Sequence, residues 1–179
     1  DIGQTAARPN VPPAAEGKIA LALIDAVSGS ALLQRNGQNY TPRKGDVVEP
    51  MDRITTSDNA ALKIKFIDDS SFAISANSDL TLDEFIFDAE SLTGAAQLRV
   101  DKGAFAFASG LLADNNPEKV IIKTPIGTLG IRGTLIAGSD NNVTIIEGAA
   151  NLTTENGTDI LLDQPLENTN IDDSGNVLS

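Results

Sequence analysis

The most informative stretch of this sequence is Lys123-Thr-Pro-Ile-Gly-Thr-Leu-Gly-Ile-Arg-Gly-Thr-Leu-Ile136. It mixes aliphatic and β-branched side chains with three glycines, and Thr124-Pro125 lies near its start. This composition predicts two strands joined by a turn. The stretch contains no Cys, His, Asp or Glu, so it offers no obvious catalytic group. It favours a scaffold or binding module over an enzyme.

Outside this stretch, apolar and polar residues alternate in many short segments. Between Ala61 and Ile67, for example, every second side chain is large and apolar, while Lys63 and Lys65 fall between them. Such segments recur about every ten residues and are separated by Gly, Asn, Asp or Ser, as in all-β proteins. We therefore expect an all-β fold, either a β-solenoid or β-roll-like stack of short strands or, alternatively, a β-sandwich.

The chain of 179 residues is long enough for one domain with a sizeable core. Aromatic residues are scarce, with one Tyr, six Phe and no Trp, so we expect a largely aliphatic core. Residues 1–17 contain Pro9, Pro12 and Pro13 and read as an N-terminal arm or linker. Residues 18–163 are predicted to form the all-β domain, and residues 164–179 an acidic C-terminal tail.

Acidic residues dominate the charge, since 13 Lys and Arg face 25 Asp and Glu for a formal net charge of −12. A nucleic-acid partner is not expected, because such a partner requires a basic patch. Arg132 is the last basic residue, and acids follow it to the end of the chain. These acids indicate either a well-solvated surface or attraction to cations or a basic partner.

The absence of Cys and His excludes disulfides and the zinc and haem sites that those residues build. Acids near predicted turns, at Asp68-Asp69 and in Asn170–Asn176, could supply oxygen ligands to calcium, but their spacing is not that of an EF-hand. We expect solvated acids there and no cofactor. No nucleophile elbow, P-loop or dinucleotide fingerprint is present, and Trp for stacking on sugars is missing, so an enzyme is not expected.

No apolar run approaches the roughly 20 residues that span a bilayer. The chain begins at Asp1 without the apolar core of a signal peptide, so we expect any export signal to have been removed. Together with the lack of Cys, this favours an extracytoplasmic location in a bacterium, either secreted, at the cell surface or periplasmic.

Six segments taken in chain order resemble the FecR domain: Gly45-Asp46, Ile54–Thr56, Phe66–Phe72, Leu98–Gly103, Lys123–Thr134 and Ile145–Gly148. The resemblance runs from Gly45 to Leu162. One departure is that Asp68-Asp69-Ser70 stands where the family has Asp-Gly-Ser. Full regulators of this family also carry a cytoplasmic anti-sigma segment, a membrane helix and a small signalling domain, which we do not find in these residues. The resemblance implies an extracytoplasmic, solenoid-like all-β domain, and the signalling role is not carried over with it.

Eight residues of the shared pattern are predicted to be critical for the fold. Arg132 is expected to pair with a carboxylate such as Glu147 or with turn carbonyls, although it could instead bind an anionic ligand. Gly130 and Gly133 are expected where φ is positive or where two backbones come close. The full set is Thr124, Pro125, Gly130, Arg132, Gly133, Thr134, Glu147 and Gly148.

For function we favour a secreted structural protein, a subunit of a filament, matrix or adhesin that forms homo-oligomers or polymers. The apolar strand expected at residues 19–24 follows the flexible arm and could pair with a neighbour through Ile19, Leu21 and Leu23. The alternative is a periplasmic FecR-like sensor that binds another protein by a strand edge in cell-surface signalling.

Overall fold

The computed structural model describes residues 7–17 and 19–178. In these residues it contains fifteen strands, one short α-helix and one 3₁₀ turn. The elements in chain order are β1 (Ala22–Ser28), β2 (Ala31–Arg35), β3 (Gln38–Tyr40), β4 (Arg53–Thr56), β5 (Ala61–Phe66), β6 (Ser71–Ile74), β7 (Asp79–Asp88), β8 (Thr93–Lys102), β9 (Phe105–Ala108), α1 (Leu111–Asn115), η1 (Pro117–Lys119), β10 (Val120–Thr124), β11 (Gly127–Gly138), β12 (Asn142–Thr154), β13 (Asp159–Leu162), β14 (Asn168–Ile171) and β15 (Val177–Leu178).

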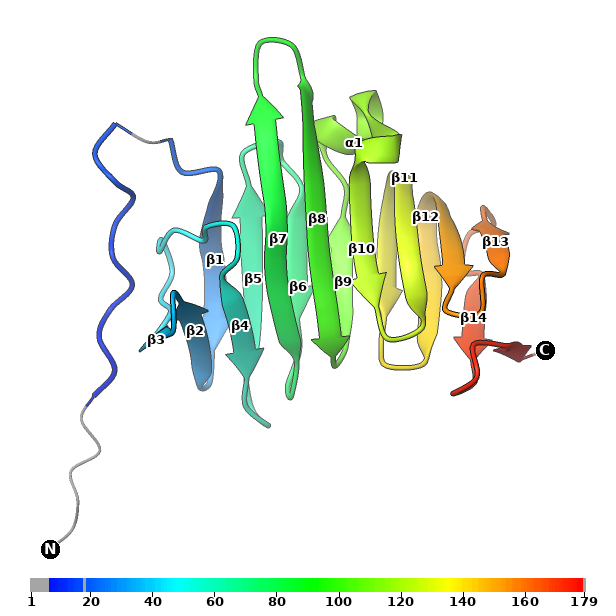
Figure 1. Cartoon of the computed structure of the whole chain (residues 1–179), viewed down its shortest axis with the longest axis horizontal. Coiled ribbons are helices and arrows are strands. Elements are labelled where there is room, and N and C mark those ends of the chain that lie inside the picture. The colour runs from blue at the N-terminus through cyan, green and yellow to red at the C-terminus, as the bar shows by residue number, and fades with distance from the viewer. Residues whose placement is uncertain (1–6, 18, 179) are drawn as a thin grey trace, which may run out of the picture.

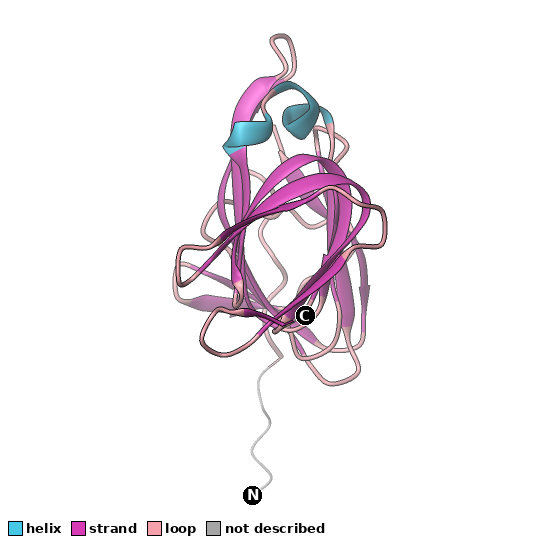
Figure 2. Ribbon diagram, turned by 90° about the vertical axis from the view of Figure 1, so that its right-hand side faces the viewer, coloured by secondary structure: helices cyan, strands magenta, loops and turns pink. Residues whose placement is uncertain are grey.

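The strands belong to one sheet that curls on itself. Its main order is β1-β5-β6-β9-β11-β10-β8-β7-β4-β2-β3, and β12 to β15 continue from β11. The curl places β7, β8 and β10 in front of β5, β6 and β9 (Figure 1), and an end view shows the strands surrounding a common interior (Figure 2). The all-β prediction is confirmed. A solenoid is not confirmed, because the strands form a curled open sheet.

Period-two alternation explains the core. In β5, Leu62, Ile64 and Phe66 are buried while Lys63 and Lys65 are exposed, as the sequence predicted. Across the interior, the rings of Phe66 in β5 and Phe85 in β7 lie 4.7 Å apart between centroids. The remaining core is mostly Ile, Leu, Val and Ala, as expected from the few aromatic residues.

The predicted N-terminal arm contacts the rest of the domain around Asn10 and Val11, while most of its other described residues are exposed. Asn10 forms a parallel bridge with Thr41, and the side chain of Val11 is buried in the core. The strand expected from Ile19 begins only at Ala22, and Ile19 itself is 76% exposed. Residues 1–6 of the arm, and residue 18 at the predicted domain boundary, lie outside the described residues.

The predicted acidic tail, residues 164–179, adds two strands to the sheet. β14 pairs with β12, and β15 pairs with β14. Thr169 and Ile171 point inward and are buried, while their neighbours are polar, so a short alternating pattern is present despite the acids. Residue 179 lies outside the described part.

Candidate functional site

The quoted stretch forms a bend that joins the two layers of the curled sheet. The first half of β11 pairs with β10 in front, and its second half pairs with β9 behind. β12 follows the same course, and the β11–β12 register shifts around residues 132–135. At this shift Gly133 and Gly148 both have positive φ, at +58° and +85°. The motif therefore lies where the sheet changes direction.

Thr134 holds the bend in place through three hydrogen bonds. Its buried hydroxyl donates to the carbonyl of Glu147. Its amide donates to Oγ of Ser109 (2.7 Å), and the amide of Ser109 donates back to the Thr134 carbonyl (2.9 Å). Thr134 thus connects β11 to β12 and to the end of β9. A buried and fully bonded hydroxyl indicates a structural role.

Thr124 and Pro125 form the turn that precedes the bend. Oγ1 of Thr124 donates to the carbonyl of Gly127 at 3.0 Å, which closes the link between β10 and β11. Pro125 is exposed in this turn, where the absence of an amide hydrogen costs nothing.

The expected ion pair between Arg132 and Glu147 is wrong. Both side chains are exposed, and the described residues offer Arg132 no acid within 4 Å. The reason is the register shift, because Arg132 lies opposite Ala149 whereas Glu147 lies opposite Leu135. Arg132 instead lines a shallow hollow with Gly130, Asn151 and two residues of η1, Pro117 and Glu118.

The expectation for Gly130 is also wrong, whereas that for Gly133 is confirmed. Gly130 does not have a positive φ, and a Cβ there would meet only the carbonyl oxygen of Asn151, at 4.0 Å. Nothing in its surroundings requires glycine. The pattern alone could not separate the two glycines, since both lie in an apolar strand.

The predicted interface residues lie beside a strand edge that is already covered. On one side β1 pairs with β5. On the other, the amide of Ile24 donates to the Asp46 carbonyl (2.8 Å), and the amide of Val48 donates to the Ala22 carbonyl (3.0 Å). Leu23 is 39% exposed, Leu21 packs against the core, and Ile19 and Leu21 line a groove of about 520 Å³ with residues 47–50. Their role in an interface stays a prediction.

Sequence reasoning missed a buried ion pair near this groove. Nε and Nη2 of Arg35 donate to both carboxylate oxygens of Asp52, at 2.8 and 2.6 Å. The amide of Glu49 also donates to Asp52, which is 1% exposed. The hydrogen bonds that Arg35 donates to Asp52 raise the pKa of Arg35, with the charges of nearby carboxylates adding to the shift. The sequence gives no specific signal for this pair, since Asp52 lies between Met51 and Arg53, far from Arg35 in the chain.

A second missed feature is the role of Asp68, which the family pattern contained. Its buried carboxylate accepts hydrogen bonds from the amide of Ser70 (3.1 Å) and from the amide of Leu112 in α1 (3.2 Å). It therefore joins the β5–β6 turn to the start of α1. Asp69, at the place of the family's glycine, has a positive φ of 68°.

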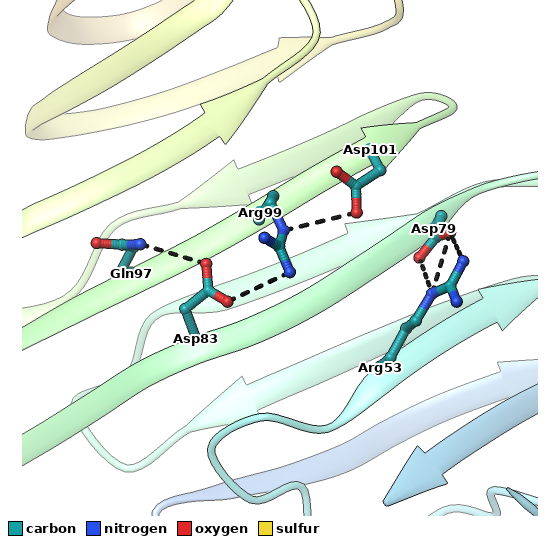
Figure 3. A network of polar contacts seen from close by, with 6 residues as sticks. All are labelled: Arg53, Asp79, Asp83, Gln97, Arg99 and Asp101. Carbon is teal, nitrogen blue, oxygen red and sulfur yellow. Dashed lines mark hydrogen bonds and ion pairs between the residues drawn. The ribbon is translucent and has the colours of Figure 1, made fainter. Parts of the chain in front are cut away.

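Ion pairs cross the outer face of β4, β7 and β8 (Figure 3). Arg53 binds Asp79 through two nitrogens, with Nε 2.9 Å from Oδ1. Arg99 lies 3.6 Å from both Asp83 and Asp101. Half of the Arg53 side chain is exposed, so these pairs contribute little to stability. Within residues 7–17 and 19–178, no cluster of acids is arranged to hold a metal ion.

The chain belongs to the FecR family, whose model, described as "FecR protein", matches residues 52–163. Two crystal structures described as a "putative anti-sigma factor" from Parabacteroides distasonis ATCC 8503 are similar, with TM-scores of 0.55 and 0.54. At 15% identity they support the fold. Each alignment covers 70% of this chain and 57% of the other, so the chain spans just over half of their length. No curated protein matches the sequence significantly.

These comparisons correct the function that we favoured from sequence. A filament, matrix or adhesin subunit is contradicted by the match to the FecR family, which favours the alternative. In addition, β1, the strand on which that hypothesis relied, already has hydrogen-bonded neighbours on both sides. The homo-oligomer stays a prediction. None of the helices in the described residues is long and apolar enough to cross a membrane.

Proposed function

We propose that this chain is the extracytoplasmic sensor domain of a FecR-type regulator of bacterial cell-surface signalling, and that it acts by binding another protein without catalysis. The observation that carries the proposal is the family match, which includes both layers of the sheet and the bend between them. FecR-like anti-sigma factors are regulatory proteins and not enzymes. The anti-sigma description of the similar structures supports the same class.

The physical properties of the domain suit this role. Buried hydrogen bonds at Thr134 and Asp68 hold the bend and the turns, so binding surfaces are presented without disulfides or metals. A sheet that does not close into a barrel has edges, and edges bind extended segments through backbone hydrogen bonds. The net charge of −12 favours a basic partner and accelerates its association.

Deletion of residues 52–163 from the gene of the producing bacterium tests the proposal. We expect the RNA profile to change at one set of promoters that share the recognition element of one sigma factor. We also expect protease added to spheroplasts to digest the domain. An unchanged RNA profile, or a domain that resists protease until the cells are lysed, would overturn the proposal.

A further inference from the structure

The hairpin of β7 and β8 extends beyond the strands beside it (Figure 1). β4 pairs with β7 only along Asp79–Thr81, and loop residues Met51 and Asp52 continue the contact as far as Leu82. From Glu84 to Asp88, the described part of the chain places only β8 beside β7. The other side of the hairpin is shielded, because α1 and η1 contact β8 and Asn116 donates to the Leu92 carbonyl (2.8 Å).

The backbone of β7 directs hydrogen-bonding groups toward this open side. The carbonyl group of Ile86 points toward Gly94 in β8. A Cβ added to Gly94 would lie 2.8 Å from the carbonyl carbon of Ile86 and would overlap the carbonyl oxygen. Backbone groups alternate in direction along a strand, so the amides and carbonyls of Phe85 and Phe87 point away from β8. Such groups form a template on which another strand can add.

Hydrogen bonds stabilise the tip of the hairpin. Oδ1 of Asp88 accepts hydrogen bonds from the amides of Glu90 (2.9 Å) and Ser91 (3.2 Å). The hydroxyls of Ser91 and Thr93 lie 2.7 Å apart. At the base, the ring of Phe85 is buried in the core. A partner strand would therefore meet an edge that is already ordered, which lowers the entropic cost of binding.

The charge of the hairpin identifies the chemistry of its partner. The sequence has no Lys or Arg between Lys65 and Arg99. Glu84 and Asp88 are exposed and, within the residues described, make no ion pair, and Ile86 between them is 57% exposed. All three point outward on β7, because Phe85 and Phe87 alternate with them and point inward. This row would match a strand with basic, apolar and basic side chains at alternate positions.

We propose that the β7 edge from Glu84 to Asp88 binds an extended basic segment of a partner protein, which adds to the sheet as a strand. The partner's Lys or Arg residues lie beside Glu84 and Asp88, and an apolar side chain covers Ile86. That the partner is a protein follows from the proposed function, and in this respect the inference rests on it. This edge differs from the one predicted from the sequence, which involves Ile19, Leu21 and Leu23.

The test uses the whole chain, labelled with ¹⁵N, and the peptide acetyl-Thr-Lys-Thr-Val-Thr-Lys-Thr-amide at about 150 mM salt. We expect chemical-shift changes at the amides of Phe85 and Phe87, and slower hydrogen exchange at both. The same peptide with Glu in place of Lys serves as the charge control and should not bind. No binding of the Lys peptide at millimolar concentration, or shift changes confined to β13 and β15, would overturn the proposal.

Two double variants with the same change in net charge distinguish binding at the β7 edge from general electrostatic attraction. The double variant Glu84→Lys/Asp88→Lys should weaken peptide binding about tenfold or more. Glu155→Lys/Asp173→Lys makes the same change in net charge at exposed turns elsewhere and should bind almost as the parent does. Equal weakening by both would overturn the proposal. The proposal would also be overturned if size exclusion showed that this chain forms a dimer and that only Glu84→Lys/Asp88→Lys abolishes the dimer. If the peptide binds as expected but deletion of residues 52–163 leaves the RNA profile unchanged, only the proposed function is contradicted.

Discussion

Gly133 and Gly148 pack backbone against backbone where β11 and β12 bend together. A Cβ on Gly148 would lie 2.8 Å from the carbonyl carbon of Gly133 and 2.8 Å from Cα of Thr134. Gly148 also has a φ of +85°, which side chains rarely adopt. The bend therefore depends on two glycines that are fifteen positions apart in the sequence and adjacent in space.

Replacement of Gly148 by Ala should destabilise the domain strongly. The positive φ alone costs about 1–3 kcal/mol, and the overlap with Gly133 adds to it. Gly130→Ala is the matched control, because Gly130 has open surroundings and a normal φ. It should be neutral or stabilise the strand by about 0.5–1 kcal/mol. Urea unfolding followed by circular dichroism measures both, and equal stabilities would contradict the bend described here.

Thr134→Val should lower the free energy of unfolding by about 1–3 kcal/mol, since it leaves the Glu147 carbonyl without its hydroxyl partner. Arg132→Gln should change it by less than about 0.5 kcal/mol, because the exposed Arg132 makes no ion pair with the described residues. Thermal unfolding of the two variants distinguishes the roles. A larger loss for Arg132→Gln would restore Arg132 as the residue that holds the bend.

Asp52→Asn should cost about 3–5 kcal/mol, because it leaves the guanidinium of Arg35 without its buried counter-charge. The raised pKa of Arg35 keeps the guanidinium charged at any ordinary pH. Asp79→Asn removes the acid of a pair whose arginine is half exposed and should cost at most about 1 kcal/mol. Chemical denaturation of both proteins is the measurement, and a similar loss in each would refute the distinction.

Asp69→Gly should stabilise the protein by up to about 1 kcal/mol, because Asp69 has a φ of 68° that glycine adopts at lower cost. The ion pair that this substitution removes is weak, since Nζ of Lys65 lies 4.0 Å from Asp69, which is 79% exposed. Asp58→Gly, at an exposed turn position without a positive φ, should instead destabilise slightly. A lower melting temperature for Asp69→Gly would show that the aspartate has a role beyond its backbone.

The tip of the β7–β8 hairpin should loosen in acid. Hydrogen bonds from the amides of Ser91 and Glu90 lower the pKa of Asp88. Since the folded pKa lies below the unfolded value of about 3.9, the contribution is complete above that value and is lost as the pH falls through the folded pKa. Amide shifts of Glu90 and Ser91 between about pH 6 and pH 2 follow the change. Asp88→Asn should abolish this titration, and a midpoint at or above the ordinary value would refute it.

The alternation of apolar and polar residues predicted most of the strands, because each side of a strand meets either the core or water. It predicted β5 and its inward-facing residues correctly. It misjudged the start of β1, since Ile19 is apolar yet lies outside the sheet. It also treated residues 164–179 as a tail, because two short strands in an acidic segment give a weak signal.

The sequence by itself determined the all-β class, the family and the positive φ of Gly133, because these depend on local alternation and on an ordered set of short motifs. Only the tertiary structure decided which edges are free. It covered β1 with residues 45–48 and buried Arg35 against Asp52. Among the described residues, it left the side of Glu84–Asp88 that faces away from β8 without a paired strand. These relationships join residues far apart in the chain, and strand pairing sets them, so no local pattern could reveal them.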